Sequence, residues 1–293
     1  MATTTAGRVG TRSLRGPTGS SWLALRALLL RDVVVLARHS PEFLARTLIQ
    51  PVLLCFVFLY VFPKIGSAVG GGASGPGGPA GPSAFATVLV AGVVGISVMF
   101  QGVQAVALQM SQEFGFTREI EDRVQAPCPI WLVAVAKVLS GTVQGLIAAL
   151  VVLPVASVVH AKGVEAQLTL HWPVVLTVVP LACVAMSALG LVLGTSFEPR
   201  NIGLMFGFII LPITFLGGTY YAWERLHAVE VGGFPWLQTL VLVNPLIYVN
   251  EGMRAAFTDV PHMHLYVVYP VLVGFCALFL WVGLRNFRRR VLS

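Results

Sequence analysis

The chain has few charged residues, and their scarcity excludes an ordinary soluble domain. Only 11% of its 293 residues are Asp, Glu, Lys or Arg, about half the share found in soluble globular proteins. Hydrophobic residues make up 56% of the chain, and its mean hydropathy is +0.83. This balance indicates a protein that is solvated mostly by lipid.

A nucleotide-binding loop is also missing. The phosphate loop G-x-x-x-x-G-K-[ST] requires a lysine after a glycine-rich turn. The lysines of this chain are Lys64, Lys137 and Lys162, and none of them follows such a pattern. The chain is therefore not itself an ATPase of the phosphate-loop class.

Patterns typical of disulfide frameworks, metal sites and catalytic sites are absent too. The four cysteines are far apart, three of them lie in apolar runs, and no C-x-x-C spacing occurs, so we expect small buried side chains. His262 and His264 have no third ligand nearby in the sequence, so we expect no metal site. No His, Asp and Ser constellation converges, which argues against a membrane enzyme.

Long apolar stretches dominate what is present. A bilayer core of about 30 Å is crossed by ~20 apolar helical residues, and these stretches lack the alternation of strands. We predict an all-α integral membrane protein with six transmembrane helices at residues 44–62, 85–108, 131–159, 172–197, 202–221 and 265–284.

The N-terminal 40 residues divide into two parts. Residues 1–20 are rich in Thr, Gly, Ser and Arg and are predicted to form a disordered basic tail. In residues 21–40, leucines recur at helical spacing, while Arg26, Arg31 and Asp32 interrupt the apolar run. We predict an amphipathic helix in the membrane interface, where Trp22 is also well suited. The membrane domain then covers residues 41–293.

Residues 224–260 are apolar but contain no full span. Residues 234–243 are too few to cross the bilayer. Asn244 and Pro245 then break the pattern, and a helical pattern with Glu251 and Arg254 follows, spaced so that the two can pair. We predict a re-entrant helix pair on the outer side of the membrane.

The distribution of basic residues orients the chain. With six spans, fifteen of the 19 lysines and arginines lie on one side, and the other side holds Lys64, Lys162, Arg225 and Arg254. The positive-inside rule then predicts a plasma-membrane protein with both termini in the cytoplasm. This topology explains the formal charge of +7, so we expect no nucleic-acid partner.

The densest charge cluster follows the second predicted span, in residues 110–129. Phe116, Ile120 and Val124 recur every four residues, so one helical face is apolar. The charged residues are Glu113, Arg118, Glu119, Glu121, Asp122 and Arg123. The pattern fits a solvated loop helix and a helix that docks onto a partner equally well.

Polar and aromatic residues within the spans give a candidate translocation path. Ser97, Gln101 and Gln104 share one face of the second span, where they could line a path or form interhelical hydrogen bonds. Aromatic residues gather toward the outer leaflet, where an aromatic belt explains them as well as a substrate path does. The candidates among them are Phe58, Tyr60, Phe215 and Tyr220.

A series of short motifs runs along residues 20 to 290. The amphipathic helix carries Arg31-Asp32, Glu113-Phe114-Gly115 follows the second span, and Ala126-Pro127 precedes the third. Gly217-Gly218 and Tyr220-Tyr221 stand at the outer end of the fifth span, and Pro235-Trp236-Leu237, Asn244-Pro245-Leu246-Ile247-Tyr248 and Glu251-x-x-Arg254 follow. In the order of these motifs, the chain resembles the type-2 ABC exporter permeases.

The resemblance implies a half-transporter. Two permease subunits, identical or different, would assemble with two nucleotide-binding ATPase subunits that hold ATP and Mg²⁺, and this chain would bind no cofactor itself. The amphipathic helix would brace the ATPase against the membrane. The residues implied to couple ATP binding to the spans are Glu113, Gly115, Arg118, Glu119, Glu121, Arg123 and Pro127.

The substrate is expected to be amphipathic or hydrophobic, such as a drug, a lipid or a lipid-linked glycan, since no span carries a charged site for a polar ion. The alternative is an ion-driven secondary transporter. Such proteins usually need an acidic residue or broken helices within the membrane, and none of the six predicted spans holds a mid-membrane Asp or Glu.

Overall fold

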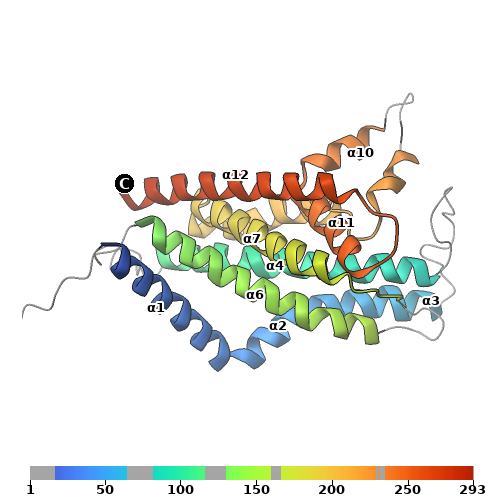
Figure 1. The fold of residues 1–293 in the computed structure, drawn as a ribbon, viewed down its shortest axis with the longest axis horizontal. Helices are drawn as coiled ribbons and strands as arrows, with labels where there is room; N and C mark the ends of the chain where they lie inside the picture. The colour runs from blue at the N-terminus through green and yellow to red at the C-terminus, as the bar shows by residue number, and fades with distance from the viewer. Residues whose placement is uncertain are drawn as a thin grey trace, which may run out of the picture.

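The computed structural model describes residues 17–64, 82–115, 130–159, 166–228, 230 and 235–292, and its regular elements there are all helical. Four long helices form the bundle (Figure 1): α4 (Pro82–Gly115), α6 (Ile130–Val158), α7 (Trp172–Ser196) and α12 (Leu265–Leu292). Beside them lie α1 (Pro17–Arg38), α2 (Ser40–Cys55), the π-helix η1 (Phe56–Val61) and α3 (Phe62–Lys64). The prediction of an all-helical membrane protein is confirmed.

Five helical stretches in the described residues are long and apolar enough to cross a membrane. They are Ser40–Val61, Ser83–Gly115, Trp131–Val155, Trp172–Ser196 and Leu265–Val291. Each coincides with one of the six predicted spans.

The remaining predicted span, residues 202–221, is shorter than expected. The apolar helix Pro199–Phe215 has η2 (Pro199–Asn201), α8 (Ile202–Met205), the π-helix η3 (Phe206–Ile210) and α9 (Leu211–Phe215). It ends at Phe215 because the chain turns at Gly217 and Gly218. Gly218 has a φ of 71°, a conformation that residues with a Cβ rarely adopt.

Other boundaries also differ from the prediction. Helix α1 begins at Pro17, inside the segment predicted to be a disordered tail, and the chain breaks at His39 before α2. Helix α12 continues to Leu292, past the predicted end of the last span at residue 284, so the arginines between residues 285 and 290 lie in the last helix. Helix α4 continues to Gly115, and thus includes the start of the predicted coupling segment 110–129.

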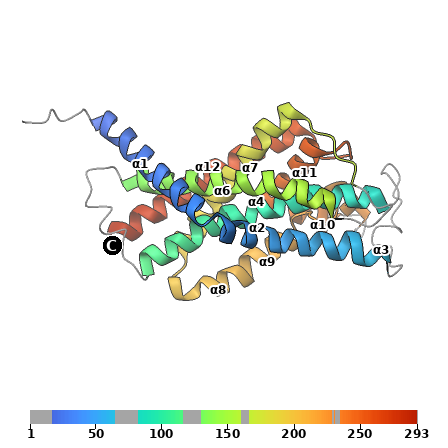
Figure 2. The ribbon, with the colours of Figure 1, turned by 90° about the horizontal axis from the view of Figure 1, so that it is seen from below.

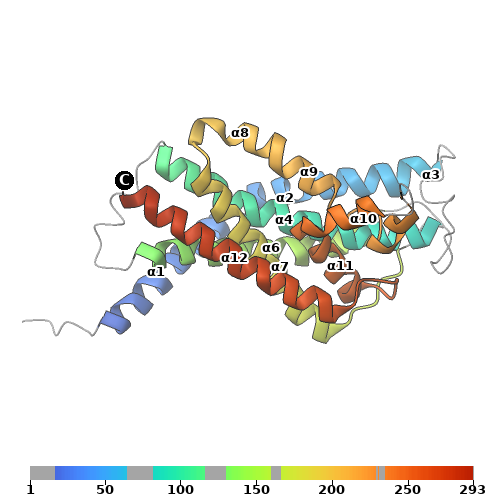
Figure 3. The ribbon, with the colours of Figure 1, turned by 90° about the horizontal axis from the view of Figure 1, so that it is seen from above.

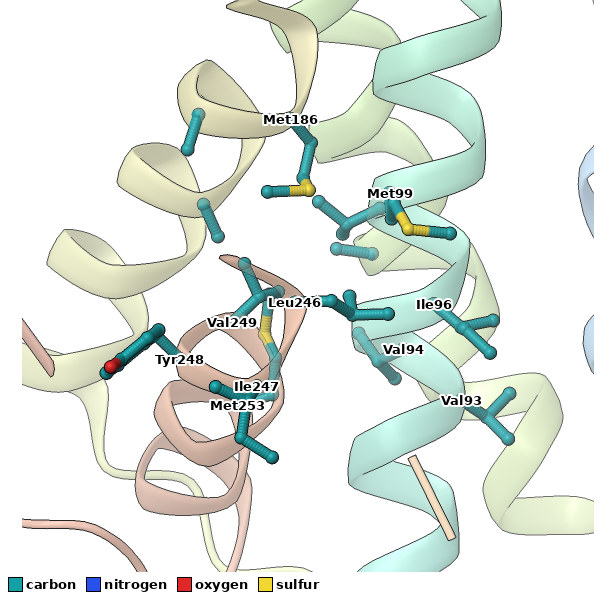
Figure 4. Packing of buried hydrophobic residues seen from close by; sticks show 14 of the residues in the cluster. Val93, Val94, Ile96, Met99, Met186, Leu246, Ile247, Tyr248, Val249 and Met253 are labelled. Carbon is teal, nitrogen blue, oxygen red and sulfur yellow. The ribbon is translucent and has the colours of Figure 1, made fainter. Parts of the chain in front are cut away.

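Helix α4 lies at the centre of the bundle. In its most apolar 18-residue window, 89% of the residues are buried, compared with 22% for the first and last spans. Figure 4 shows Val94 of α4, Met186 of α7 and Leu246 of α11 (Pro245–Phe257) meeting in the apolar core. Cys55, Cys183 and Cys276 are buried as predicted, and Cys128 lies outside the described residues.

Small residues allow α4, α6 and α7 to pack closely. A Cβ at Gly190 of α7 would lie 2.8 Å from the carbonyl oxygen of Val103, and one at Gly141 of α6 would lie 2.7 Å from a methyl group of Val106. Burying an apolar side chain between helices gains little free energy in a membrane, because lipid tails are equally apolar. Close van der Waals contacts of this kind therefore hold the helices together.

One face of the bundle carries two π-helical segments. Helices α2–α3 and α8–α9 run along the same side of the molecule in Figures 2 and 3, and η1 and η3 interrupt these two runs. Large apolar side chains on this face are exposed in the single chain, among them Phe56, Tyr60, Phe208 and Phe215. A π-helical turn is rare and often marks a functional position.

The far end of the bundle, opposite the end of α12, contains short helices joined by irregular chain. They are η4 (Trp223–Ala228), α10 (Trp236–Leu240), η5 (Val241–Val243) and α11. The side-chain oxygen of Asn244 accepts from the backbone N–H of Leu246, 2.9 Å away, and so caps α11. The predicted pair of short helices, broken at Asn244 and Pro245, is present.

A buried ion pair holds this irregular chain together. Arg254 is fully buried, and its Nη1 lies 2.6 Å from Oε1 of Glu251, which is 1% exposed. The pairing predicted from their spacing is confirmed.

Both partners also bind backbone. Arg254 donates to the carbonyl oxygens of Gly218 and Tyr221, the latter at 2.9 Å. Glu251 accepts from the backbone N–H groups of Trp223 and Met263, at 2.8 and 2.9 Å. These bonds satisfy backbone groups outside regular helices, which would otherwise be costly to bury.

We expect Arg254→Gln to destabilise the protein by about 3–5 kcal/mol, because it leaves the Glu251 carboxylate buried without its countercharge. Thermal unfolding of the detergent-solubilised chain, followed by size-exclusion chromatography, measures this loss. Arg288→Gln, at an exposed arginine, is the matched control and should unfold like the wild type. Equal stability of the two variants would contradict the structural role assigned to Arg254.

Candidate functional site: the C-terminal end of the bundle

The ends of α4, α7 and α12 meet at the C-terminal end of the bundle. The guanidinium group of Arg290 donates to the carbonyl oxygens of Gly194, Thr195 and Phe197 at 2.8–3.3 Å, and so caps the C-terminus of α7. The same group lies 4.7 Å from the ring centroid of Phe114, near the end of α4. Arg290 therefore joins three helices. From the sequence alone, it counted only among the basic residues that orient the chain in the membrane.

A second contact joins α4 to α6. The Nζ of Lys137 lies 2.6 Å from Oε1 of Glu113 and 3.3 Å from Oε1 of Gln109. Lys137 is 6% exposed and Glu113 is 8% exposed, so this ion pair is buried. The ammonium group of Lys137 therefore pairs within the bundle.

The Glu113–Lys137 pair joins the start of the predicted coupling segment 110–129 to α6. Glu113 and Gly115 lie in the last turns of α4, and Lys137 lies two turns into α6. A Cβ at Gly115 would lie 2.5 Å from Pro199, so the end of α4 also packs against the turn after α7. The other predicted coupling residues, Arg118, Glu119, Glu121, Arg123 and Pro127, lie outside the described residues.

A polar cavity of about 360 Å³ adjoins this ion pair, between α1, α2, α4 and α6. Arg31 and Asp32, predicted for the interfacial helix, line it, and Arg26 and Arg31 are both exposed. Trp22 lies within α1. The cavity thus brings the Arg-Asp pair of α1 close to Glu113 of α4, a proximity that their separation in sequence did not predict.

The candidate path residues do not form one lined channel within the single chain. Ser97 and Gln101 are buried in the bundle, and the Ser97 hydroxyl donates to the carbonyl of Val93, while Gln104 is half-buried. The ring of Phe58 lies 5.5 Å from that of Tyr220. Tyr60 and Phe215 are instead exposed on the α2 and α9 face. The path assignment remains a prediction.

The residues predicted for the outer segment pack together at the far end of the bundle. Asn244 donates to the carbonyl of Ile213 at 2.8 Å, and Asn250 donates to that of Gly217 at 2.6 Å. A Cβ at Gly217 would lie 2.4 Å from Leu246, so α11 packs directly on this turn. The predicted far-end residues Gly217, Gly218, Asn244, Pro245, Glu251 and Arg254 therefore form one packed unit.

These features define a helical, multi-pass membrane protein with its charges paired at two ends of the bundle. Residues 24–258 match the model of the ABC-2 type transporter family. The chain belongs to this family, as its motif order predicted, and is thus a transmembrane subunit of an ABC transporter.

Curated relatives agree with this assignment. The inner membrane transport permease YadH of Escherichia coli K12 is 26% identical over 262 residues, which cover 88% of this chain and 92% of the relative. The permease of the same name from Shigella flexneri matches equally well. Family membership implies association with an ATPase subunit.

Exchanging the charges of the α4–α6 ion pair tests its role. Glu113→Lys and Lys137→Glu each place two like charges side by side in a buried position, so each should destabilise the protein by about 3 kcal/mol or more. The double variant restores an ion pair with reversed polarity and should recover most of the loss. Thermal unfolding of all three variants measures this, and a double variant no better than the worse single one would contradict the pairing.

Proposed function

We propose that the chain is the permease subunit of an ATP-driven exporter that moves an amphipathic or hydrophobic substrate out of the cytoplasm. Two permeases and two ATPase subunits form the transporter, and the ATPases bind ATP and Mg²⁺. Family membership supports the permease role. The structural observation that best supports coupling to an ATPase is the buried Glu113–Lys137 contact at the coupling segment.

The proposed topology has six spans and both termini in the cytoplasm. The C-terminal end of the bundle, with the arginines of α12, then faces the cytoplasm, in agreement with the positive-inside rule. Helix Pro199–Phe215 serves as the fifth span, with α10 and α11 as the re-entrant pair on the outer side. Helix α1 lies in the inner membrane interface.

Coupling follows from how the ends of the helices are joined. A movement of residues 116–129 by the ATPase acts on α4 and α6 together, because Glu113 and Lys137 connect these helices next to the segment. Arg290 and Phe114 pass the same displacement to α7 and α12. The bundle thus moves as a unit, which suits a transporter driven from one end.

The translocation path is proposed along the face formed by α2 and α8–α9, between two permease subunits. Helix α4 fills the centre of the single chain, so a wide path through it would require the core to separate. The exposed aromatic side chains of that face, among them Phe56, Phe208 and Phe215, suit an apolar or amphipathic substrate.

Ion-driven transport is less well supported. Such a carrier needs an acidic side chain within the membrane that can bind and release a cation. In the described parts of the chain, the buried acidic residues Glu113 and Glu251 are both engaged by basic side chains.

Reversing the charges of Glu119 and Glu121 tests the coupling proposal. We expect Glu119→Lys with Glu121→Lys to lower ATP hydrolysis of the reconstituted complex to the rate of the ATPase alone, while membrane insertion is unchanged. Glu224→Lys, at an exposed acidic residue of the far end, is the control and should keep coupled activity. Full coupled activity in the double variant would refute a docking role for this segment.

A further inference from the structure

Two adjoining cavities of different chemistry lie where α1 meets α6. The polar cavity of about 360 Å³ described above is lined by charged side chains of both signs: Arg31, Arg46 and Lys137, the acidic Asp32, Glu42 and Glu113, and also His39. A second cavity of about 190 Å³ lies between α1 and α6 and is lined mainly by apolar side chains, including Leu29, Val33 and Val143. Asp32, Leu36 and Ser140 line both cavities, so the two are neighbours.

The polar cavity is a built site and not a chance surface hollow. Lys137 and Glu113, both more than nine-tenths buried, form part of its wall, and Gln109 and Gln144 add amide groups. Arg46 and Glu42, exposed on α2, lie at its rim. A ligand here can meet a basic and an acidic side chain at once.

We infer that the paired cavities bind one zwitterionic glycerophospholipid of the surrounding bilayer. The headgroup occupies the polar cavity, where its phosphate faces Arg46 and its ammonium group faces Glu42 and Asp32. Part of an acyl chain occupies the apolar cavity between α1 and α6. A polar and an apolar compartment that share a wall match the two halves of such a molecule.

The balance of charges selects the headgroup. An anionic headgroup such as phosphatidylglycerol brings a phosphate for the arginines of the cavity but no positive group for Glu42 and Asp32, and the repulsion between its charge and these carboxylates costs binding energy. A headgroup that carries both charges pairs with both sets of side chains. The site therefore distinguishes lipids by headgroup charge, in contrast to the basic pockets that collect anionic lipids.

Lipid binding at this site requires neither export activity nor an ATPase partner. It requires only that α1 and the adjoining parts of α2 and α6 contact the bilayer, which follows from a multi-pass membrane protein. A bound lipid at this place would fill the space between α1 and the bundle, and would hold α1 against α6.

Native mass spectrometry of the purified full chain tests the inference. The chain is equilibrated in detergent with equal amounts of phosphatidylethanolamine and phosphatidylglycerol that have the same acyl chains. We expect the wild type to retain phosphatidylethanolamine preferentially, by roughly threefold or more, as suits charge contacts at a partly exposed rim. Equal retention of the two lipids would overturn the proposal.

Three variants separate the contributions of the acidic rim, the basic rim and the wall shared by the two cavities to lipid binding. Glu42→Gln removes a partner of the ammonium group and should abolish the preference, whereas Arg46→Ala should lower retention of both lipids by roughly threefold. Ser140→Leu fills the wall shared by the two cavities and should lower retention further. Arg200→Ala, at an exposed arginine away from the cavities, is the control. A preference that persists in Glu42→Gln, or undiminished retention in Ser140→Leu at unchanged thermal stability, would also overturn the assignment.

Discussion

Lipid offers no hydrogen-bond partners to a polypeptide backbone, and this constraint decides where the chain can leave the helical conformation. The long helices satisfy their own N–H and C=O groups. The irregular chain between α9 and η4 depends on Arg254, which donates to the carbonyls of Gly218 and Tyr221. Its partner Glu251 accepts from Trp223 at the start of η4 and from Met263 before α12. The far end of the bundle is therefore ordered around one buried ion pair.

The same constraint places charge at the other end of the bundle. Lys137 cannot be buried alone, and it is buried here because Glu113 of α4 lies 2.6 Å away. Arg290 likewise binds the free carbonyls at the end of α7, where a helix leaves acceptors without partners. Both contacts tie helix ends together next to residues 116–129, so in the proposed mechanism a push on that segment reaches four helices.

Much of this fold could be predicted from the sequence, because long apolar runs leave few alternatives in a bilayer. The break at Asn244 and Pro245 and the pairing of Glu251 with Arg254 depend on local spacing and were likewise predictable. The Glu113–Lys137 pair could not be predicted, because its partners are 24 residues apart in the sequence and no local pattern links them. The early end of the helix at Phe215 was missed because Leu216, Tyr220 and Tyr221 extend the pattern of large apolar and aromatic residues, although the Gly217-Gly218 turn ends the helix. The adjoining cavities depend on how α1 packs on α6, which periodicity does not reveal.

The role as an ATP-driven permease is tested by purifying the tagged chain from its native membrane in mild detergent and identifying the bound proteins by mass spectrometry. We expect a partner that carries a phosphate-loop ATPase motif, present in an equimolar amount. A preparation that lacks such a partner and still transports in vesicles without ATP would contradict the assignment as an ATP-driven permease and favour an ion-driven carrier.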